Sequence, residues 1–328
     1  MGMRRRLLLV MGLCLLLFWS TGTRDVRAGD YPDHEIRMIV AMGVGGGVDR
    51  MARSVQRFLP DIMKCSVLVE NEPAGGGKVG VRKFLKLPAD GYTLFVQLQP
   101  TMTTLKMSDP KLFQWDDIAV ININWTDPTL FVVNKNTGWK SLDDMIQAAK
   151  KNPGKYSFSI PAQNTPGHIM AMVLFEKLGL NIKMIPYDSG GSARAALRGG
   201  HVEINAGGAE GMVVLEDVSV PLGVCWDKPI PAWPNVRPIN EALAKYNVKL
   251  PSVGSVRFFA THGEFKRKNP EQWKFLVSSF EKLVTEHKGF QEFCDKGKIG
   301  RDWLGPDKSM ELVMETEEVF KKILAPKK

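Results

Sequence analysis

The sequence lacks the motifs that identify most enzymes. Its five histidines include no His-Glu-x-x-His pair, its four cysteines include no Cys-x-x-Cys pair, and no Gly-x-Ser-x-Gly motif occurs. These absences leave a zinc protease, a thiol redox protein and a serine hydrolase without support. We therefore expect no catalytic residues, no metal and no cofactor.

Long runs of one charge are also missing. The chain has a net charge of +9 but no run of five or more basic residues, so a solvated surface is favoured over a nucleic-acid-binding face. Residues 1–28 hold five arginines and one aspartate, and without them the net charge falls from +9 to +5. We expect no nucleic-acid partner.

One long apolar run is present, at residues 7–19. It follows three arginines at positions 4–6 and precedes Ala28, the order found in a secretory signal peptide. The run is shorter than the roughly 20 residues that span a bilayer, so a signal peptide cleaved after about Ala28 is favoured over an uncleaved membrane anchor. Cys14 lies inside the run, which argues against a lipid-anchored cysteine. The predicted location is the periplasm.

The remaining cysteines are Cys65, Cys225 and Cys294, an odd number at wide spacing. One bridge with one free thiol is compatible with an oxidising compartment, but the spacing does not choose a pair. Three buried thiols are the interpretation we favour.

Without the signal peptide, about 300 residues remain, more than the usual single domain. Short apolar runs rich in β-branched residues alternate with helical patterns, which predicts α/β lobes with a mainly parallel sheet. Strands are expected at 36–40, 66–70, 93–97, 130–133, 157–160, 183–186 and 253–260, and helices at 49–59, 80–86, 141–151, 167–178, 270–287 and 308–324. Ser141 is the expected cap of its helix, and we expect the last two helices to pack back on the first lobe.

Three glycine-rich turns connect strands to helices, at residues 43–47, 73–77 and 189–192. Glycine lets the backbone approach a ligand, and the free N–H groups at a helix N-terminus favour an anion. The alternative is that these turns are only tight connections. The dinucleotide pattern read from Gly43 needs glycine at Val48, and a phosphate loop read through Lys78 needs serine or threonine at Val79. Sites for NAD and ATP are therefore excluded.

Several words of the sequence resemble those of a known receptor family. Residues 40–49 (VAMGVGGGVD) resemble its V-P-F-x-x-G-G-x-x-D loop, residues 69–77 (VENEPAGGG) its V-E-N-x-P-G-A-G-G loop, and residues 90–94 (DGYTL) match its D-G-Y-T-L word. Pro186-Tyr187 and residues 199–203 are similar to two further segments. The family is that of the Bug-type (TctC-like) receptors of tripartite tricarboxylate transporters. Ala41 and Met42 replace its proline and phenylalanine.

The resemblance implies a type II periplasmic-binding-protein fold, with two α/β lobes joined by two crossover strands. We expect lobe 1 at 29–128, lobe 2 at 129–256 and a return to lobe 1 at 257–328, with crossings near 127–130 and 253–260. The implied function is a monomeric periplasmic receptor that captures a small carboxylate by backbone amides and ordered water and delivers it to membrane transporter subunits. Alternatives are a diverged receptor used in sensing, or an enzyme such as a hydrolase using Asp49 or His168.

The expected ligand-binding residues combine the glycine turns with the positions that match the family. Asp49 is expected either to orient water or a ligand group or to cap its helix, and Thr165 either to donate its hydroxyl or to cap the following helix. His168 is expected to donate to a carboxylate or to be a structural histidine, and Trp125 and Tyr187 either flank a planar ligand or belong to the core. The full set is Met42, Gly43, Gly45, Gly46, Gly47, Asp49, Asn71, Gly75, Gly76, Gly77, Thr165, His168, Ser189 and Gly190.

Overall fold

The computed structural model describes residues 31–325, so the predicted signal peptide and its cleavage site lie outside the described residues. The strands are β1 (Ile36–Val40), β2 (Val67–Asn71), β3 (Thr93–Gln99), β4 (Ile118–Asn134), β5 (Ser157–Ile160), β6 (Lys183–Pro186), β7 (Ile204–Gly208), β8 (Ser219–Val224) and β9 (Gly254–His262). The helices are α2 (Gly47–Met63), α3 (Lys78–Lys86), α4 (Thr101–Ser108), α5 (Leu142–Lys151), α6 (Pro166–Leu178), α7 (Gly190–Arg198), α8 (Ala209–Met212), α9 (Ile239–Leu243), α10 (Gly263–Lys268), α11 (Pro270–Thr285), α12 (Lys288–Gly297) and α13 (Gly305–Leu324).

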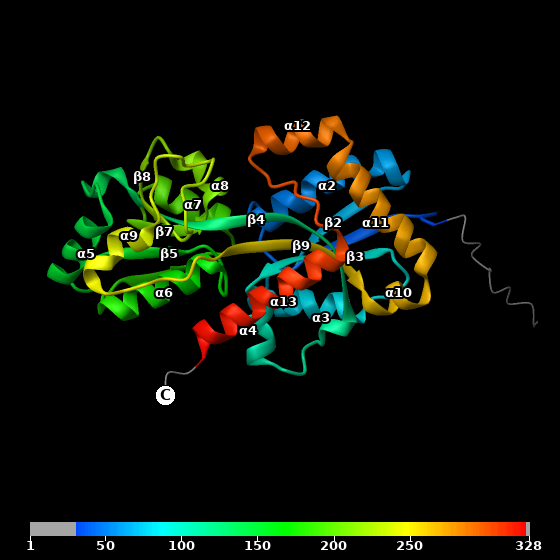
Figure 1. Ribbon diagram of the computed structural model, residues 1–328, viewed down its shortest axis with the longest axis horizontal. Helices are drawn as coiled ribbons and strands as arrows, with labels where there is room; N and C mark the ends of the chain where they lie inside the picture. Colours follow the sequence, from blue (N-terminus) through cyan, green and yellow to red (C-terminus); the bar gives the residue numbers. More distant parts are fainter. Residues whose placement is uncertain (1–30, 326–328) are drawn as a thin grey trace, which may run out of the picture.

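The first lobe is built on β2, β1 and β3, which lie parallel in that order and are covered by α2, α3, α4, α10, α11 and α12 (Figure 1). Helix α2 shows why these residues form a helix: Val48, Met51, Val55 and Leu59 recur at helical spacing and are buried against the sheet. Each strand leads into a helix that returns across the sheet, the connection that parallel strands require.

The second lobe contains β7, β5 and β6, with β8 on the other side of β4, and helices α5 to α9. Strands β5 and β6 begin and end as predicted, and the Ser141 side chain accepts a hydrogen bond from the Asp144 amide at the start of α5, as expected of a cap. The core of this lobe lies between the sheet and helices α5 and α6.

Strands β4 and β9 join the lobes and lie side by side across the middle of the molecule (Figure 1). They pair antiparallel from Ile118 opposite His262 to Pro128 opposite Gly254, and β4 then continues into the second lobe, where it pairs with β7 and β8. A mainly parallel sheet was therefore an incomplete expectation: the chain leaves the first lobe on one of these strands and returns on the other, so they run in opposite directions. The boundaries expected at residues 128 and 256 stay a prediction.

The last helix does not pack on the first lobe alone. In α13, Val313 belongs to a core cluster of the first lobe, whereas Phe320 is buried in the core of the second lobe. The amphipathic pattern of the helix predicts that one face is buried but does not say against which lobe. Helix α13 therefore bridges the two lobes (Figure 1).

The three cysteines within residues 31–325 are free thiols. Cys225 and Cys294 are buried as predicted, whereas Cys65 is only half-buried. None of the helices in this range combines the length and the hydropathy of a membrane span.

Candidate functional site

A closed cleft lies between the two lobes, and it holds a cavity of about 60 Å³. Its walls come from the turn after β1, the junction of β4 and β9, the turn before α6, the start of α7 and the end of β7. The lining residues are Met42, Gly43, Gly46, Gly47, Val48, Arg50, Leu98, Trp125, Asp127, Thr129, Pro161, Thr165, Pro166, Gly167, Ser189, Gly190, Arg194, Gly207, Gly208, Gly211, Met212, Ser255 and Arg257. A molecule in this cavity contacts both lobes at once.

The lobes touch directly at the rim of the cleft. A Cβ placed on Gly43 in the first lobe would lie 2.2 Å from the carbonyl oxygen of Asp188 in the second, so only glycine permits this approach. Arg194 Nη2 donates to the Gly45 carbonyl oxygen at 3.3 Å, and Thr101 Oγ1 donates to the Asn164 carbonyl oxygen at 3.1 Å. These contacts hold the two lobes in a closed arrangement.

Arg257 is the most deeply buried cation of the cleft, with 5% of its surface exposed. Its Nη2 donates to Asp127 Oδ2 at 3.0 Å, and its guanidinium lies 3.8 Å from the centre of the Trp125 ring. A Cβ on Gly47 would lie 2.9 Å from the same guanidinium. The planar group thus packs against an aromatic ring and against the first residue of α2.

Two of the nitrogens of Arg257, Nε and Nη1, find no hydrogen-bond partner among residues 31–325. Asp127 has both oxygens engaged, because Oδ1 accepts from the Glu210 amide at 3.1 Å while Oδ2 accepts from Arg257. Buried donors without partners are uncommon and cost free energy, above all on a charged group. The wall of the cleft therefore has donor capacity that the described protein does not use.

Arg50 and Arg194 add two further guanidinium groups to the lining. Burial, together with the positive charges of Arg50 and Arg257, lowers the pKa of Arg194 to about 10. Arg50 Nη2 donates to the carbonyl oxygens of Gly297 and Lys298, and burial lowers its pKa as well. The cleft is electrostatically suited to an anion.

Half of the predicted ligand-binding residues line this cleft: Met42, Gly43, Gly46, Gly47, Thr165, Ser189 and Gly190. Gly75 and Gly76 line a second cavity of about 530 Å³. Met42 and Gly43 line both cavities. Tyr187 also lines the second cavity. Gly45, Asp49, Asn71, Gly77 and His168 belong to neither lining. The turn at 73–77 therefore lines the second cavity and not the interlobe cleft.

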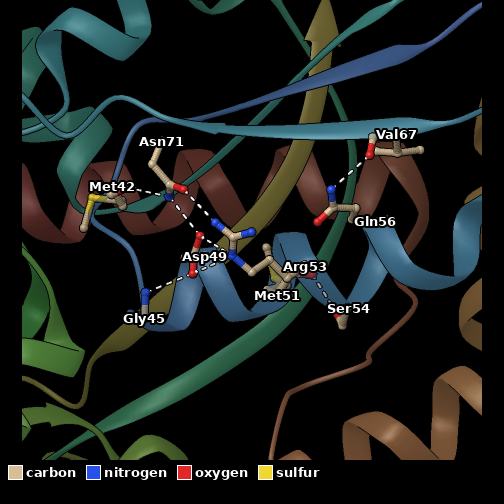
Figure 2. Close-up of polar contacts among 9 residues, drawn as sticks. All are labelled: Met42, Gly45, Asp49, Met51, Arg53, Ser54, Gln56, Val67 and Asn71. Atoms are coloured by element: carbon tan, nitrogen blue, oxygen red, sulfur yellow. Dashed lines mark hydrogen bonds and ion pairs between the residues drawn. The ribbon is translucent and has the colours of Figure 1, made fainter.

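Asp49 lies in a polar network that holds the first glycine turn in place (Figure 2). Its Oδ2 accepts from the Gly45 amide at 2.9 Å, its Oδ1 accepts from Asn71 Nδ2 at 2.9 Å, and Arg53 forms an ion pair with it at 3.0 Å. Asn71 Nδ2 also donates to the Met42 carbonyl oxygen. Asp49 and Asn71 thus hold the backbone of the first glycine turn in place. This contact differs from both roles expected for Asp49: it joins protein groups to one another, and the capping position of α2 is Gly46.

Two residues at the start of α6 use their polar atoms within the second lobe. Thr165 lines the cleft, but its hydroxyl donates to the Ala162 carbonyl oxygen at 2.8 Å and makes no side-chain cap. His168 Nδ1 accepts from the Asn164 amide at 3.2 Å, and burial lowers the pKa of the imidazole. His168 is therefore placed as a neutral residue that orders the turn before α6.

Sequence reasoning missed the charged lining residues Arg50, Arg194, Arg257 and Asp127. A signal was present for one of them: Arg257 is a single charged residue inside the apolar stretch at 253–260, and a cation in a buried strand needs a partner. Within the described residues, no group of three or more His, Cys, Asp and Glu side chains is arranged to hold a metal ion.

Comparison with known proteins agrees with this architecture. Protein BugT of Bordetella pertussis is 32% identical over 202 residues, which are 60% of this chain and 61% of that protein. The chain thus spans about three fifths of the length of the curated relatives it matches.

Solved structures show the same fold. The periplasmic binding protein BugD superposes with a TM-score of 0.76 at 21% identity, covering 91% of this chain and 100% of that one. MatC from Rhodopseudomonas palustris, solved with bound malate, has a TM-score of 0.77 at 17% identity, covering 89% and 99%. The predicted two-lobed α/β fold of periplasmic binding proteins is confirmed.

The family model described as "Tripartite tricarboxylate transporter family receptor" (TctC) matches residues 51–266. This match covers both glycine-rich turns that follow β2 and β6, together with the whole of β4 and β9. The chain belongs to the TctC family of tripartite tricarboxylate transporter receptors, as its motifs predicted.

Proposed function

We propose that this protein is a periplasmic receptor that captures a small carboxylate between its lobes and passes it unaltered to a tripartite tricarboxylate-type membrane transporter. The observation that carries the proposal is the closed interlobe cleft, whose charged lining residues are three arginines and one aspartate. Such a cleft attracts an anion and excludes water from it when the lobes are together.

The family of the chain and a structural neighbour support a carboxylate as the ligand. MatC was solved with malate in the same fold, and the chain belongs to a family of transporter receptors. Small carboxylates carry the negative charge that the arginines of the lining attract. Release to a transporter requires the lobes to separate, and the antiparallel strands β4 and β9 are the connections about which they would turn.

A thermal-shift screen tests ligand capture. The purified protein is heated with acetate, succinate, malate, adipate or citrate, since binding to the native state raises stability by about 2.7 kcal/mol at a hundredfold excess over Kd. We expect at least one di- or tricarboxylate to raise the melting temperature and to be recovered unchanged. No shift with any acid, or a converted product, would contradict the proposal.

Delivery is tested separately by deleting the gene and measuring uptake of the labelled acid. We expect the uptake to fall.

A further inference from the structure

The positive and negative charges that line the interlobe cleft are unequal in number. Arg50, Arg194 and Arg257 contribute three positive charges, and Asp127 contributes one negative charge. Glu210 lies nearby but outside the lining: its carboxylate favours the charged forms of Arg50 and Arg257, while burial, followed by the charge of Asp127, raises its own pKa. The lining thus has two more positive than negative charges.

The single carboxylate of the lining is already committed to one guanidinium. Asp127 forms its ion pair with Arg257 at 3.0 Å, and within residues 31–325 no carboxylate ion-pairs with Arg50 or Arg194. Arg194 is instead surrounded by backbone: its Nη2 donates to the Gly45 carbonyl, and its Nη1 lies beside Gly190 and Gly211. Buried positive charges without counter-ions are costly, so a bound anion stabilises this arrangement most when it brings two negative charges.

Contacts with its neighbours hold Arg257 in place. Trp125 and Gly47 pack against its guanidinium, Asp127 accepts from Nη2, and the buried N–H groups of Nε and Nη1 remain without partners in the described protein. A guanidinium fixed in this way loses little conformational entropy when it binds an acid group. Arg194 differs because it belongs to the second lobe while its Nη2 donates to Gly45 in the first. It therefore contributes to the contact between the closed lobes as well as to the positive charge of the cleft.

We propose that Arg257 and Arg194 bind the ligand's acid groups directly, and that the excess of positive charge in the lining makes the cleft selective for a doubly charged small acid over a singly charged one. This inference rests on the proposed function and assigns its specificity to side-chain charge, in place of the backbone amides and ordered water expected from the sequence. In this proposal the glycine turns allow the lobes to approach each other, and the arginines recognise the negative charges of the ligand.

Calorimetric titration with matched ligands tests the charge selection. Succinate, malate and adipate are each compared with the corresponding monomethyl ester, which has nearly the same size and one negative charge fewer. We expect the best dicarboxylate to bind at least about 30-fold more tightly than its monoester, as for truncation of one partner of a buried charge pair. Equal affinity for the two would overturn the inference, and so would binding of monoesters alone.

Variants assign the selection to residues. Arg194→Met is expected to weaken the dicarboxylate by about 30-fold or more and the monoester by much less, so that the preference shrinks. Because Arg257→Met alone leaves Asp127 unpaired, the variant Arg257→Met/Asp127→Asn is measured beside it, and we expect this pair to fold and to lose dicarboxylate binding. The matched control is Arg198→Met, on the same helix as Arg194 but exposed and paired with Asp217, which should bind as wild type does.

The outcomes separate the inference from the proposed function. If wild-type protein binds carboxylates while Arg194→Met and the double variant bind them equally well, the inference is wrong and the receptor proposal stands. If wild-type protein binds no carboxylate of any charge, both are wrong. If the control Arg198→Met loses as much affinity as Arg194→Met, the effect belongs to the helix and the inference fails.

Discussion

Arg257 lies diagonally across from Asp127 on the two strands that join the lobes, and their side chains form a buried ion pair at 3.0 Å. The register places Trp125 opposite Arg257 and Ser255 opposite Asp127, so the pair connects neighbouring positions on one face of the sheet. Gly208 is in contact with both side chains, since a Cβ there would lie 2.0 Å from Asp127 Oδ2. The pair therefore anchors the point where β4 passes from one lobe to the other.

Asp127→Asn should lower the free energy of unfolding by about 3–5 kcal/mol, because it leaves the Arg257 charge buried without its counter-ion. Arg257→Met/Asp127→Asn, which removes both charges, should regain more than half of that loss. Urea unfolding followed by circular dichroism measures both values. The exposed partner Asp217 offers a control, since Asp217→Asn should change the midpoint little. Wild-type stability in Asp127→Asn would show that the pair contributes nothing.

Gly43→Ala should weaken ligand binding with little effect on folding. The backbone of Gly43 is compatible with alanine, but its Cβ would lie 2.2 Å from the Asp188 carbonyl oxygen of the other lobe, so the closed arrangement must open. We expect a loss of affinity of about tenfold or more, which corresponds to about 1.4 kcal/mol. Calorimetry with the best acid from the screen measures it, beside Gly289→Ala on the surface helix α12, whose nearest neighbours would lie at 3.4 Å. Tight binding by Gly43→Ala would mean that the ligand does not need this closure.

Asp49→Ala should destabilise the first glycine turn, because the Gly45 amide and Asn71 Nδ2 both lose their acceptor. We expect a loss of about 1–3 kcal/mol in the free energy of unfolding, the usual cost of leaving buried polar groups without partners. Asp49→Asn should recover part of it, since its amide oxygen can still accept one of the two bonds. If Asp49→Ala keeps wild-type stability but binds no ligand, Asp49 contacts the ligand directly and the supporting role is wrong.

Stability should fall as the pH decreases below about 6.5, the ordinary value for histidine. Burial lowers the pKa of His168 and of His262, so below 6.5 the unfolded chain binds protons that the folded protein does not. Each histidine contributes a slope of at most about 1.4 kcal/mol per pH unit, present until the pH falls below its pKa in the folded state. Melting temperatures of wild-type protein and His168→Gln between pH 7.5 and 5.5 test this. The variant should show the shallower fall, and parallel curves would contradict the assignment to His168.

The sequence was sufficient for features that local pattern determines. The apolar runs at 157–160 and 183–186 became β5 and β6 with the predicted bounds, and Ser141 caps α5, because each depends only on nearby residues. Features that depend on distant partners were not accessible in this way. The length of β4 arises from pairing with three other strands, and the attachment of Phe320 in α13 to the second lobe arises from packing between segments far apart in the chain.

The site was predicted in the same uneven manner. Residues of the glycine turns at 43–47 and 189–192 line the cleft, because the place of each turn directly after a strand fixes where it lies. Arg257 and Asp127 were missed because each looks unremarkable alone, and only the register of β4 against β9 brings them together beside the cleft. The role of a single polar residue depends on which neighbours the fold brings into contact with it. Asp49 is in contact with Gly45, Arg53 and Asn71.

The claim that a carboxylate is held between the lobes is tested most directly by hydrogen exchange. Amide exchange is measured by mass spectrometry with and without the acid that gives the largest thermal shift. The account predicts slower exchange on binding in both lobes together, at residues 43–50 in the first and 189–194 in the second, and at the junction 255–257, because the ligand contacts all three and holds the lobes closed. Protection confined to one lobe, or located only at surfaces away from these segments, would contradict capture in the interlobe cleft.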